Sequence, residues 1–163
     1  MRKFNSIFSV FRRPANAVAF INGSEEYPDI KGLVFFYQMR EGVMVRAEIF
    51  GLPKEAEVCD TPIFAFHIHS GSQCTGDEND FFADTKGHYN PKDCPHPYHA
   101  GDMPSLFSVN GKAVLAFLTD RFTVKEILEK AVVIHSSTDD FATQPSGNAG
   151  KKIACGVIKP TAR

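Results

Sequence analysis

Six histidines are the residues of this chain best suited to chemistry. They are His67, His69, His88, His96, His99 and His135. A single histidine is more often a surface residue or a hydrogen-bonded core residue than a ligand, but imidazole is also the commonest metal ligand in proteins. His67 and His69 lie two residues apart in an alternating run, so both rings leave the same face of a strand. Two rings on one rigid strand suit a metal ion that needs fixed geometry.

A second set of donors follows a three-residue spacing. His96, His99 and Asp102 can converge on one ion in a tight loop. Two imidazoles and one carboxylate, completed by one more histidine, form the tetrahedral nitrogen and oxygen site that suits zinc. The alternative is a solvated polar loop, which Pro95 and Pro97 also fit.

The remaining histidines fit copper, which favours several imidazoles. His67 and His69 supply two, and His135, at the end of another predicted strand, supplies a third. Each of the two sites then lacks one ligand, and His88 is the histidine left over. Since imidazole has two ring nitrogens, a deprotonated His88 can bridge both ions.

The elements that must position these donors are short strands separated by turns. Alternating, β-branched and aromatic runs predict eight strands, within residues 17–21, 33–39, 43–49, 63–69, 106–109, 113–119, 132–135 and 153–158. Arg40-Glu41-Gly42 predicts one hairpin, and Asn110-Gly111 predicts another. The only predicted helix covers residues 123–130, with Thr123 as its N-cap and Glu126 completing a capping box.

Eight short strands with turns between them are typical of a β-sandwich or closed barrel. Phe64, Phe66 and Ile68 lie on the face of their strand opposite His67 and His69 and can anchor it in the core. Residues 70–105 and 136–150 are long, polar and loop-like, and long loops in compact domains are usually functional. We therefore expect an all-β domain with two long functional loops.

Composition limits the partners. The 163 residues suit one domain, 1–163, in which 1–16 form an N-terminal extension. A net charge of -1 without a basic stripe argues against nucleic acid and anionic lipid, and no apolar run is long enough to span a membrane. Arg12 and Arg13 end the apolar stretch after the basic start, so we interpret the N-terminus as mature sequence and predict the cytoplasm, with export as the alternative.

The four cysteines form no C-x-x-C pair, which argues against a redox motif or a thiolate zinc site. They are Cys59, Cys74, Cys94 and Cys155. Four buried thiols are one interpretation. A disulfide is the sharper alternative, although it conflicts with a cytoplasmic location, because the cytosol is usually reducing.

Five motifs, in order along the chain, resemble the copper/zinc superoxide dismutases over residues 17–160. They are Phe66-His67-Ile68-His69, Gly87-His88-Tyr89-Asn90-Pro91, His99-Ala100-Gly101-Asp102, Val133-Ile134-His135 with Asp139-Asp140, and Gly147-Asn148-Ala149-Gly150 running to Ala154-Cys155-Gly156-Val157-Ile158. The family's fold is an eight-stranded Greek-key β-barrel, related to the immunoglobulin sandwich. The spacing of four residues between His69 and Cys74 resembles that of bacterial rather than animal members.

The resemblance implies a role for each site residue. It implies His67, His69, His88 and His135 as copper ligands and His88, His96, His99 and Asp102 as zinc ligands, with His88 as the bridge. It implies Asp139 as an outer carboxylate linking a copper-ligand histidine to a zinc-ligand histidine, and Cys74–Cys155 as the intrasubunit disulfide. Cys59 and Cys94 are additional and either pair or stay reduced. Family members are commonly dimers, so a homodimer is expected.

One departure from the family pattern concerns the substrate. Lys152 stands where the family usually has an arginine near the copper. A lysine is a point charge rather than a planar fork, so it attracts an anion but orients it less well. Two divalent ions contribute a charge of +4, and Asp102 and a bridging imidazolate subtract two. The net charge of the site is then near +2, which would attract a small anion locally.

The expected activity is superoxide dismutation, in which copper cycles between Cu(II) and Cu(I) while His88 exchanges a proton and zinc stays structural. His88 and Lys152 are then the catalytic residues. A copper carrier or buffer without turnover is the main alternative. A structural or adhesive β-sandwich with histidine-rich loops is a third hypothesis, which predicts no metal.

Overall fold

A computed structural model describes residues 7–54 and 62–161. Its main feature is a curled seven-stranded antiparallel sheet with the strand order β5-β8-β9-β1-β2-β3-β7, accompanied by a two-stranded sheet of β4 and β6. The strands are β1 (Ala17–Gly23), β2 (Lys31–Gln38), β3 (Val43–Phe50), β4 (Ile63–Phe64), β5 (Phe66–His69), β6 (Leu106–Phe107), β7 (Lys112–Thr119), β8 (Ala131–His135) and β9 (Lys152–Pro160). The all-β fold that the sequence predicts is confirmed, and the two sheets have the architecture of a Greek-key β-barrel.

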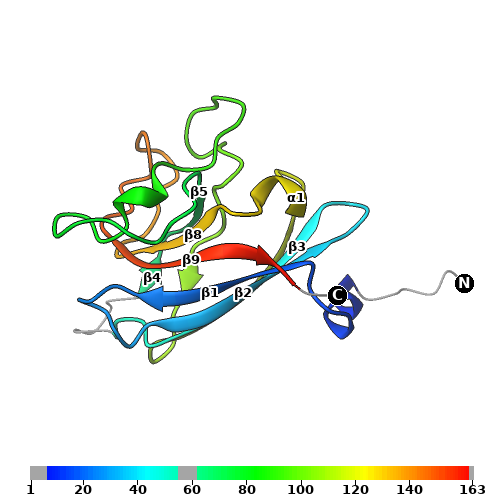
Figure 1. The fold of residues 1–163 in the computed structure, drawn as a ribbon, viewed down its shortest axis with the longest axis horizontal. Helices are drawn as coiled ribbons and strands as arrows, with labels where there is room; N and C mark the ends of the chain where they lie inside the picture. The colour runs from blue at the N-terminus through cyan, green and yellow to red at the C-terminus, as the bar shows by residue number, and fades with distance from the viewer. Residues whose placement is uncertain (1–6, 55–61, 162–163) are drawn as a thin grey trace, which may run out of the picture.

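The long segments 70–105 and 136–151 lie together beside β5 and β8, at the upper left of Figure 1, in green and orange. They contain little regular structure, apart from a short 3-10 helix, η2 (Ala83–Thr85). The N-terminal 3-10 helix η1 (Ile7–Arg12) lies at the other end of the molecule, where Val10 is buried against Tyr37 and Met44. The two loops therefore share one end of the sheet.

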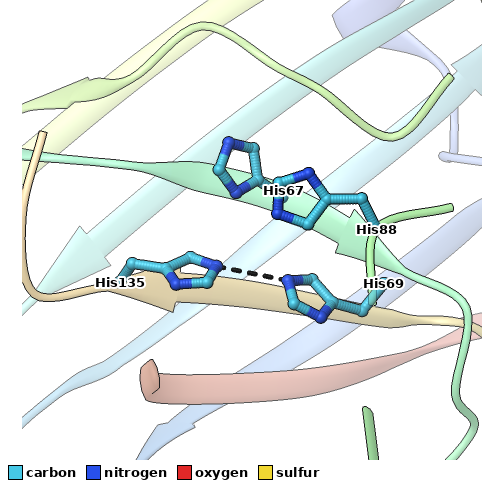
Figure 2. A group of neighbouring side chains, drawn as sticks. All are labelled: His67, His69, His88 and His135. Carbon is cyan, nitrogen blue, oxygen red and sulfur yellow. Dashed lines mark hydrogen bonds between the residues drawn. The ribbon is translucent and has the colours of Figure 1, made fainter. Parts of the chain in front are cut away.

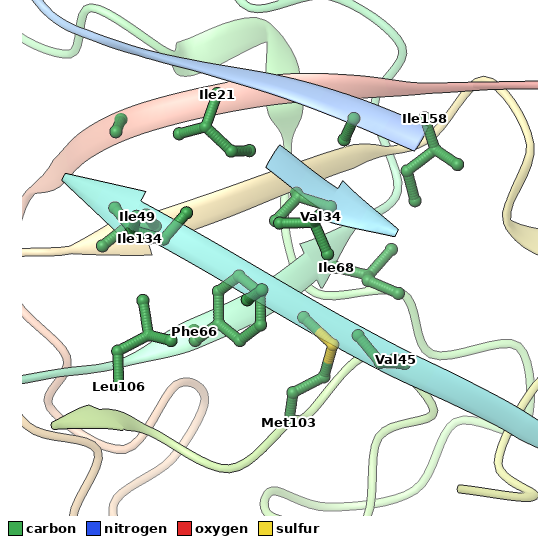
Figure 3. Packing of buried hydrophobic residues seen from close by; sticks show 14 of the residues in the cluster. Ile21, Val34, Val45, Ile49, Phe66, Ile68, Met103, Leu106, Ile134 and Ile158 are labelled. Carbon is green, nitrogen blue, oxygen red and sulfur yellow. The ribbon is translucent and has the colours of Figure 1, made fainter. Parts of the chain in front are cut away.

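The core holds β5 in place from the face opposite its histidines. Phe66 and Ile68 are fully buried and pack in one cluster with Met103, Leu106 and Ile134 (Figure 3). Burying a side chain of this size stabilises a fold by about 1.5–3 kcal/mol. The alternation in 63–69 therefore places aromatic and aliphatic groups in the core and the histidines on the opposite face of the strand, as predicted, and on that face both histidines are buried as well.

The predicted strand 63–69 is interrupted at Ala65. The amide of Ala65 donates to the Ser137 carbonyl (2.8 Å), and the His135 amide donates to the Ala65 carbonyl (2.9 Å). Residues before this point pair with β6 and residues after it pair with β8. One predicted strand thus serves two sheets, and the described chain has nine strands where the sequence predicts eight.

The turn at Asn110-Gly111 forms, but it does not join a regular hairpin. Both residues have positive φ, 51° and 78°, as a tight hairpin turn requires. Among the described residues, the Val109–Lys112 bridge is the only pairing between the two arms of this turn. Beyond it the arms separate, because β6 pairs with β4 and β7 pairs with β3. The turn lies at the corner where the chain passes from one sheet to the other.

The predicted helix is shorter than expected. Helix α1 covers Val124–Ile127, and Thr123 and Glu126 form the predicted capping box. The helix ends early because Leu128 takes an extended conformation and Glu129 has a φ of 64°. Elsewhere in the described chain, no helix has the length and apolar character needed to cross a bilayer.

Cys74 and Cys155 form the disulfide implied by the resemblance, which ties the first long loop to β9. Cys94 has no disulfide partner among the described residues, and Cys59 lies outside them, so pairing between the two stays untested. The interpretation of 1–163 as one domain also stays a prediction.

Candidate metal centre

The first loop is fastened to the strand that carries His67 and His69. The Ile68 amide donates to the Gly101 carbonyl (2.9 Å), and the Tyr89 amide donates to the Ile68 carbonyl (2.8 Å). A side chain at Gly101 would place its Cβ 2.2 Å from the Ile68 carbonyl oxygen, so only glycine allows this approach. The two contacts bring His88 and Asp102 beside β5.

Four imidazoles meet at this point in a first donor group, formed by His67, His69, His88 and His135, whose ligand atoms all lie within 4.8 Å of one another. Figure 2 shows the rings turned toward a common centre. His69 and His135 approach each other through their Nε2 atoms, 3.2 Å apart, while their Nδ1 atoms face the carbonyl oxygens of Lys86 (2.7 Å) and Gly150 (3.4 Å). With the protons on Nδ1, two nitrogen lone pairs face each other.

Two further ring nitrogens of this group are buried without a hydrogen-bond partner. His67 donates from Nε2 to Asp139 (2.8 Å), which leaves its Nδ1 unpartnered. His88 contacts Asp102 through Nδ1 (2.7 Å), which leaves its Nε2 unpartnered. Buried polar atoms nearly always have partners. Four inward-facing lone pairs are therefore a donor set that fits a cation.

The second donor group consists of His88, His96, His99 and Asp102. The Nδ1 atoms of His88, His96 and His99 lie 2.7, 3.1 and 3.4 Å from the carboxylate oxygens of Asp102. Burial raises the pKa of Asp102, but the hydrogen bond with His88 and the three neighbouring imidazoles outweigh it and lower the pKa. Three imidazoles and an ionised carboxylate match a tetrahedral zinc site.

Asp139 links the two donor groups through hydrogen bonds to one histidine of each group. Its carboxylate accepts a hydrogen bond from His67 Nε2 (2.8 Å) and another from His96 Nε2 (2.9 Å). Burial raises the pKa of Asp139, but the bonds from His67, the Phe141 amide and His96 lower it to about 2. A Cβ at Gly147 would lie 1.9 Å from an Asp139 oxygen, so the glycine leaves room for this bridge.

Burial keeps His67, His69 and His135 of the first group neutral by lowering their pKa values. It is the largest cause that lowers the pKa values of His67 and His69, and it lowers the pKa of His135 to about 3. A neutral imidazole has the free lone pair that a metal ligand needs.

The family model for copper/zinc superoxide dismutase (SODC) matches residues 30–158, which contain both donor groups. The chain belongs to the copper/zinc superoxide dismutase family.

The relatives include bacterial and extracellular proteins. The chain is 36% identical over 146 residues to superoxide dismutase [Cu-Zn] 2 of Aquifex aeolicus, with 80% of each chain covered. It is 32% identical to superoxide dismutase [Cu-Zn] of Legionella pneumophila, over 78% of this chain and 77% of the relative. It is 33% identical to the extracellular superoxide dismutase [Cu-Zn] of Rattus norvegicus, over 82% of this chain and 56% of the relative. The copper and zinc of the family fit the two donor groups.

A pocket of about 750 Å³ opens onto the first donor group of this superoxide dismutase family member. His69, His88 and His135 line it, and so does Lys152. The Lys152 ammonium is not free, however: it donates to Asp80 Oδ2 (2.7 Å) and to the Phe82 carbonyl (3.1 Å). The sequence predicts Lys152 at the site, but nothing in the sequence indicates that Asp80 is its acidic partner.

Arg121, like Asp80, has a role at the site that the sequence does not predict. Its Nη1 lies 3.0 Å from the carbonyl oxygen of Pro97 and 3.3 Å from those of His99 and Asp102. It thereby fastens the segment that carries two members of the second donor group. An isolated arginine after a strand gives no sequence signal for such a role.

Proposed function

We propose that this chain dismutates superoxide, with copper held by His67, His69, His88 and His135 and zinc held by His88, His96, His99 and Asp102. The observation that carries the proposal is that one ring, His88, belongs to both donor groups. Copper in the first group supplies the one-electron chemistry by cycling between Cu(II) and Cu(I). Overall, one superoxide loses an electron and leaves as dioxygen, while a second gains an electron and two protons and leaves as hydrogen peroxide.

The protein's own residues bind the substrate and handle protons. His88 lines the pocket, and its Nε2 is buried without a protein partner, so whenever this atom does not hold copper it can hold a proton and release it toward a bound anion. Asp139 fixes the orientation of His67 and His96, which is how carboxylates commonly orient ligand histidines. Lys152 contributes positive charge at the pocket wall, where an anion enters.

Stopped-flow decay of superoxide tests this proposal. The protein is loaded with one copper and one zinc, freed of loose metal, and mixed with superoxide. The proposal expects decay far faster than with metal-free protein. Copper and zinc bound at one each without turnover would contradict it and would support the copper carrier or buffer instead.

Two finer predictions accompany the activity. The cytoplasmic location predicted from the N-terminal sequence is opposed by the Cys74–Cys155 disulfide, which is favoured in an oxidising compartment. Cell fractionation decides between them. A homodimer is supported by exposed apolar side chains at Phe107, Val109 and Val114, which a second copy could cover. Analytical ultracentrifugation of the metal-loaded protein tests it.

A further inference from the structure

The ion pair between Lys152 and Asp80 lies in the wall of the pocket that leads to the first donor group. Both residues line this pocket together with His69, His88 and His135. The Lys152 side chain is 15% exposed and that of Asp80 is 39% exposed, so the pair is partly sheltered but open to solvent. An anion that enters the pocket therefore meets a cation and a carboxylate side by side.

Asp80 is held in place by its own loop. Its Oδ1 accepts a hydrogen bond from the Phe82 amide (3.0 Å), which leaves Oδ2 for Lys152. Its carbonyl oxygen accepts from the amides of Asp77 (3.1 Å) and Ala83 (3.0 Å). The carboxylate is therefore positioned by local backbone contacts as well as by the lysine.

The charges around the pocket balance. Apart from the histidines, its lining carries three acidic residues and three lysines: Glu26, Glu78, Asp80, Lys86, Lys151 and Lys152. Neutralising Asp80 alone would leave the lining with a net charge of +1. Because field lines concentrate in a cleft, one charge at this position changes the local concentration of a small anion.

We propose that Asp80 limits the attraction of anions to this site. It cancels the charge of Lys152 while fixing its position. Asp80 and Phe82 occupy two of the three N–H bonds of the ammonium, so one remains for an anion in the pocket. The inference rests on the proposed function, because it assumes that the anion reacts at the first donor group.

The test compares the metal-loaded wild type with Asp80→Asn, Lys152→Gln and the double variant. Asparagine keeps the size of Asp80 and one of its two acceptor oxygens but removes the negative charge. At low ionic strength we expect Asp80→Asn to raise kcat/KM for superoxide by roughly two- to fivefold and to steepen its fall with salt. The double variant restores the net charge of the wild type, so its salt dependence should return to the wild-type slope.

Glu41→Gln is the matched control, because it removes one negative charge from the exposed turn between β2 and β3, outside the pocket lining. Its rate and salt slope should equal those of the wild type. If Asp80→Asn fails to fold, Lys152→Gln carries the test: it leaves the Asp80 charge uncancelled, so kcat/KM should fall and the salt dependence should become shallower.

Azide binding to Cu(II), followed by absorbance, gives a readout that does not depend on turnover. Asp80→Asn should lower the azide Kd by roughly two- to fivefold, in line with the kinetic change. Lack of turnover in the metal-loaded wild type would overturn the proposed function. Turnover in the wild type with an unchanged or slower Asp80→Asn, or with an unchanged or weaker azide affinity, would overturn the role of Asp80 alone.

Discussion

The Nε2 atoms of His69 and His135 lie 3.2 Å apart, and each ring turns its Nδ1 toward a backbone carbonyl oxygen. The two rings come from neighbouring strands, β5 and β8, but not from paired positions, because His69 lies opposite Ala131 and His135 follows Ile134, the partner of Phe66. A cation between the lone pairs relieves their repulsion, whereas protons on both nitrogens would oppose each other. The arrangement therefore favours the binding of a metal ion and disfavours protonation of the two rings at low pH.

The metal-free protein should lose stability as the pH falls. Burial lowers the pKa of His135 from 6.5 to about 3 in the folded chain, and it also lowers that of His69. Between these pH values the unfolded chain binds more protons than the folded one, so the free energy of unfolding falls as the pH falls. The slope is about 1.4 kcal/mol per pH unit for each extra proton.

Urea denaturation in the presence of a chelator, from about pH 7 to about pH 4, measures this slope. His135→Gln should flatten it, because the glutamine does not titrate. A wild-type slope no steeper than that of the variant would contradict the prediction.

Asp139→Asn should weaken zinc binding by roughly 10- to 100-fold. The carboxylate accepts hydrogen bonds from both His67 and His96, whereas an amide has one oxygen and would turn its NH₂ group toward the other ring. Competition with a chromophoric zinc chelator measures the affinity. Asp140→Asn is the control, because Asp140 is exposed and bonds to Thr143 in its own loop. Equal affinities in the two variants would argue against the bridge.

Removing the disulfide should cost about 4 kcal/mol in the free energy of unfolding, because Cys74 and Cys155 are 81 residues apart and the bond restricts a long loop in the unfolded chain. Cys74→Ser/Cys155→Ser, compared with the wild type in urea, measures the loss. Cys94→Ser, which removes a cysteine that has no disulfide partner among the described residues, should change stability by less than about 0.5 kcal/mol. Equal losses in both would show that the disulfide contributes little.

The sequence predicts the strands well where the alternation of apolar and polar residues is enough to show on which face of a strand each side chain lies. Residues 43–49 and 63–69 alternate, and the core-facing residues are buried as expected: Val43, Val45, Ala47, Ile49, Phe64, Phe66 and Ile68. The break at Ala65 and the separation of β6 from β7 could not be predicted, because they depend on which sheet each half of the chain joins. Such pairing is decided by partners distant in the sequence.

The site likewise combines features that the local sequence predicts with contacts between distant segments that it does not predict. Residue types and spacing pick out the six histidines and Asp102, which the structure brings together in two groups. The proton positions on His67 and His88 depend on Asp139 and Asp102, and the partner of Lys152 comes from a loop 72 residues away. Contacts between loops leave no periodic trace in a sequence.

The shared ring of His88 is tested most directly by electron paramagnetic resonance of protein carrying Cu(II) in the first donor group and Co(II) in the second. Two paramagnetic ions that share one imidazolate are magnetically coupled, so the Cu(II) signal of the copper-only protein should disappear or broaden strongly once cobalt is added. In His88→Ala the signal should persist with both ions bound. An unchanged Cu(II) signal in wild-type protein that holds one copper and one cobalt would contradict the bridged pair.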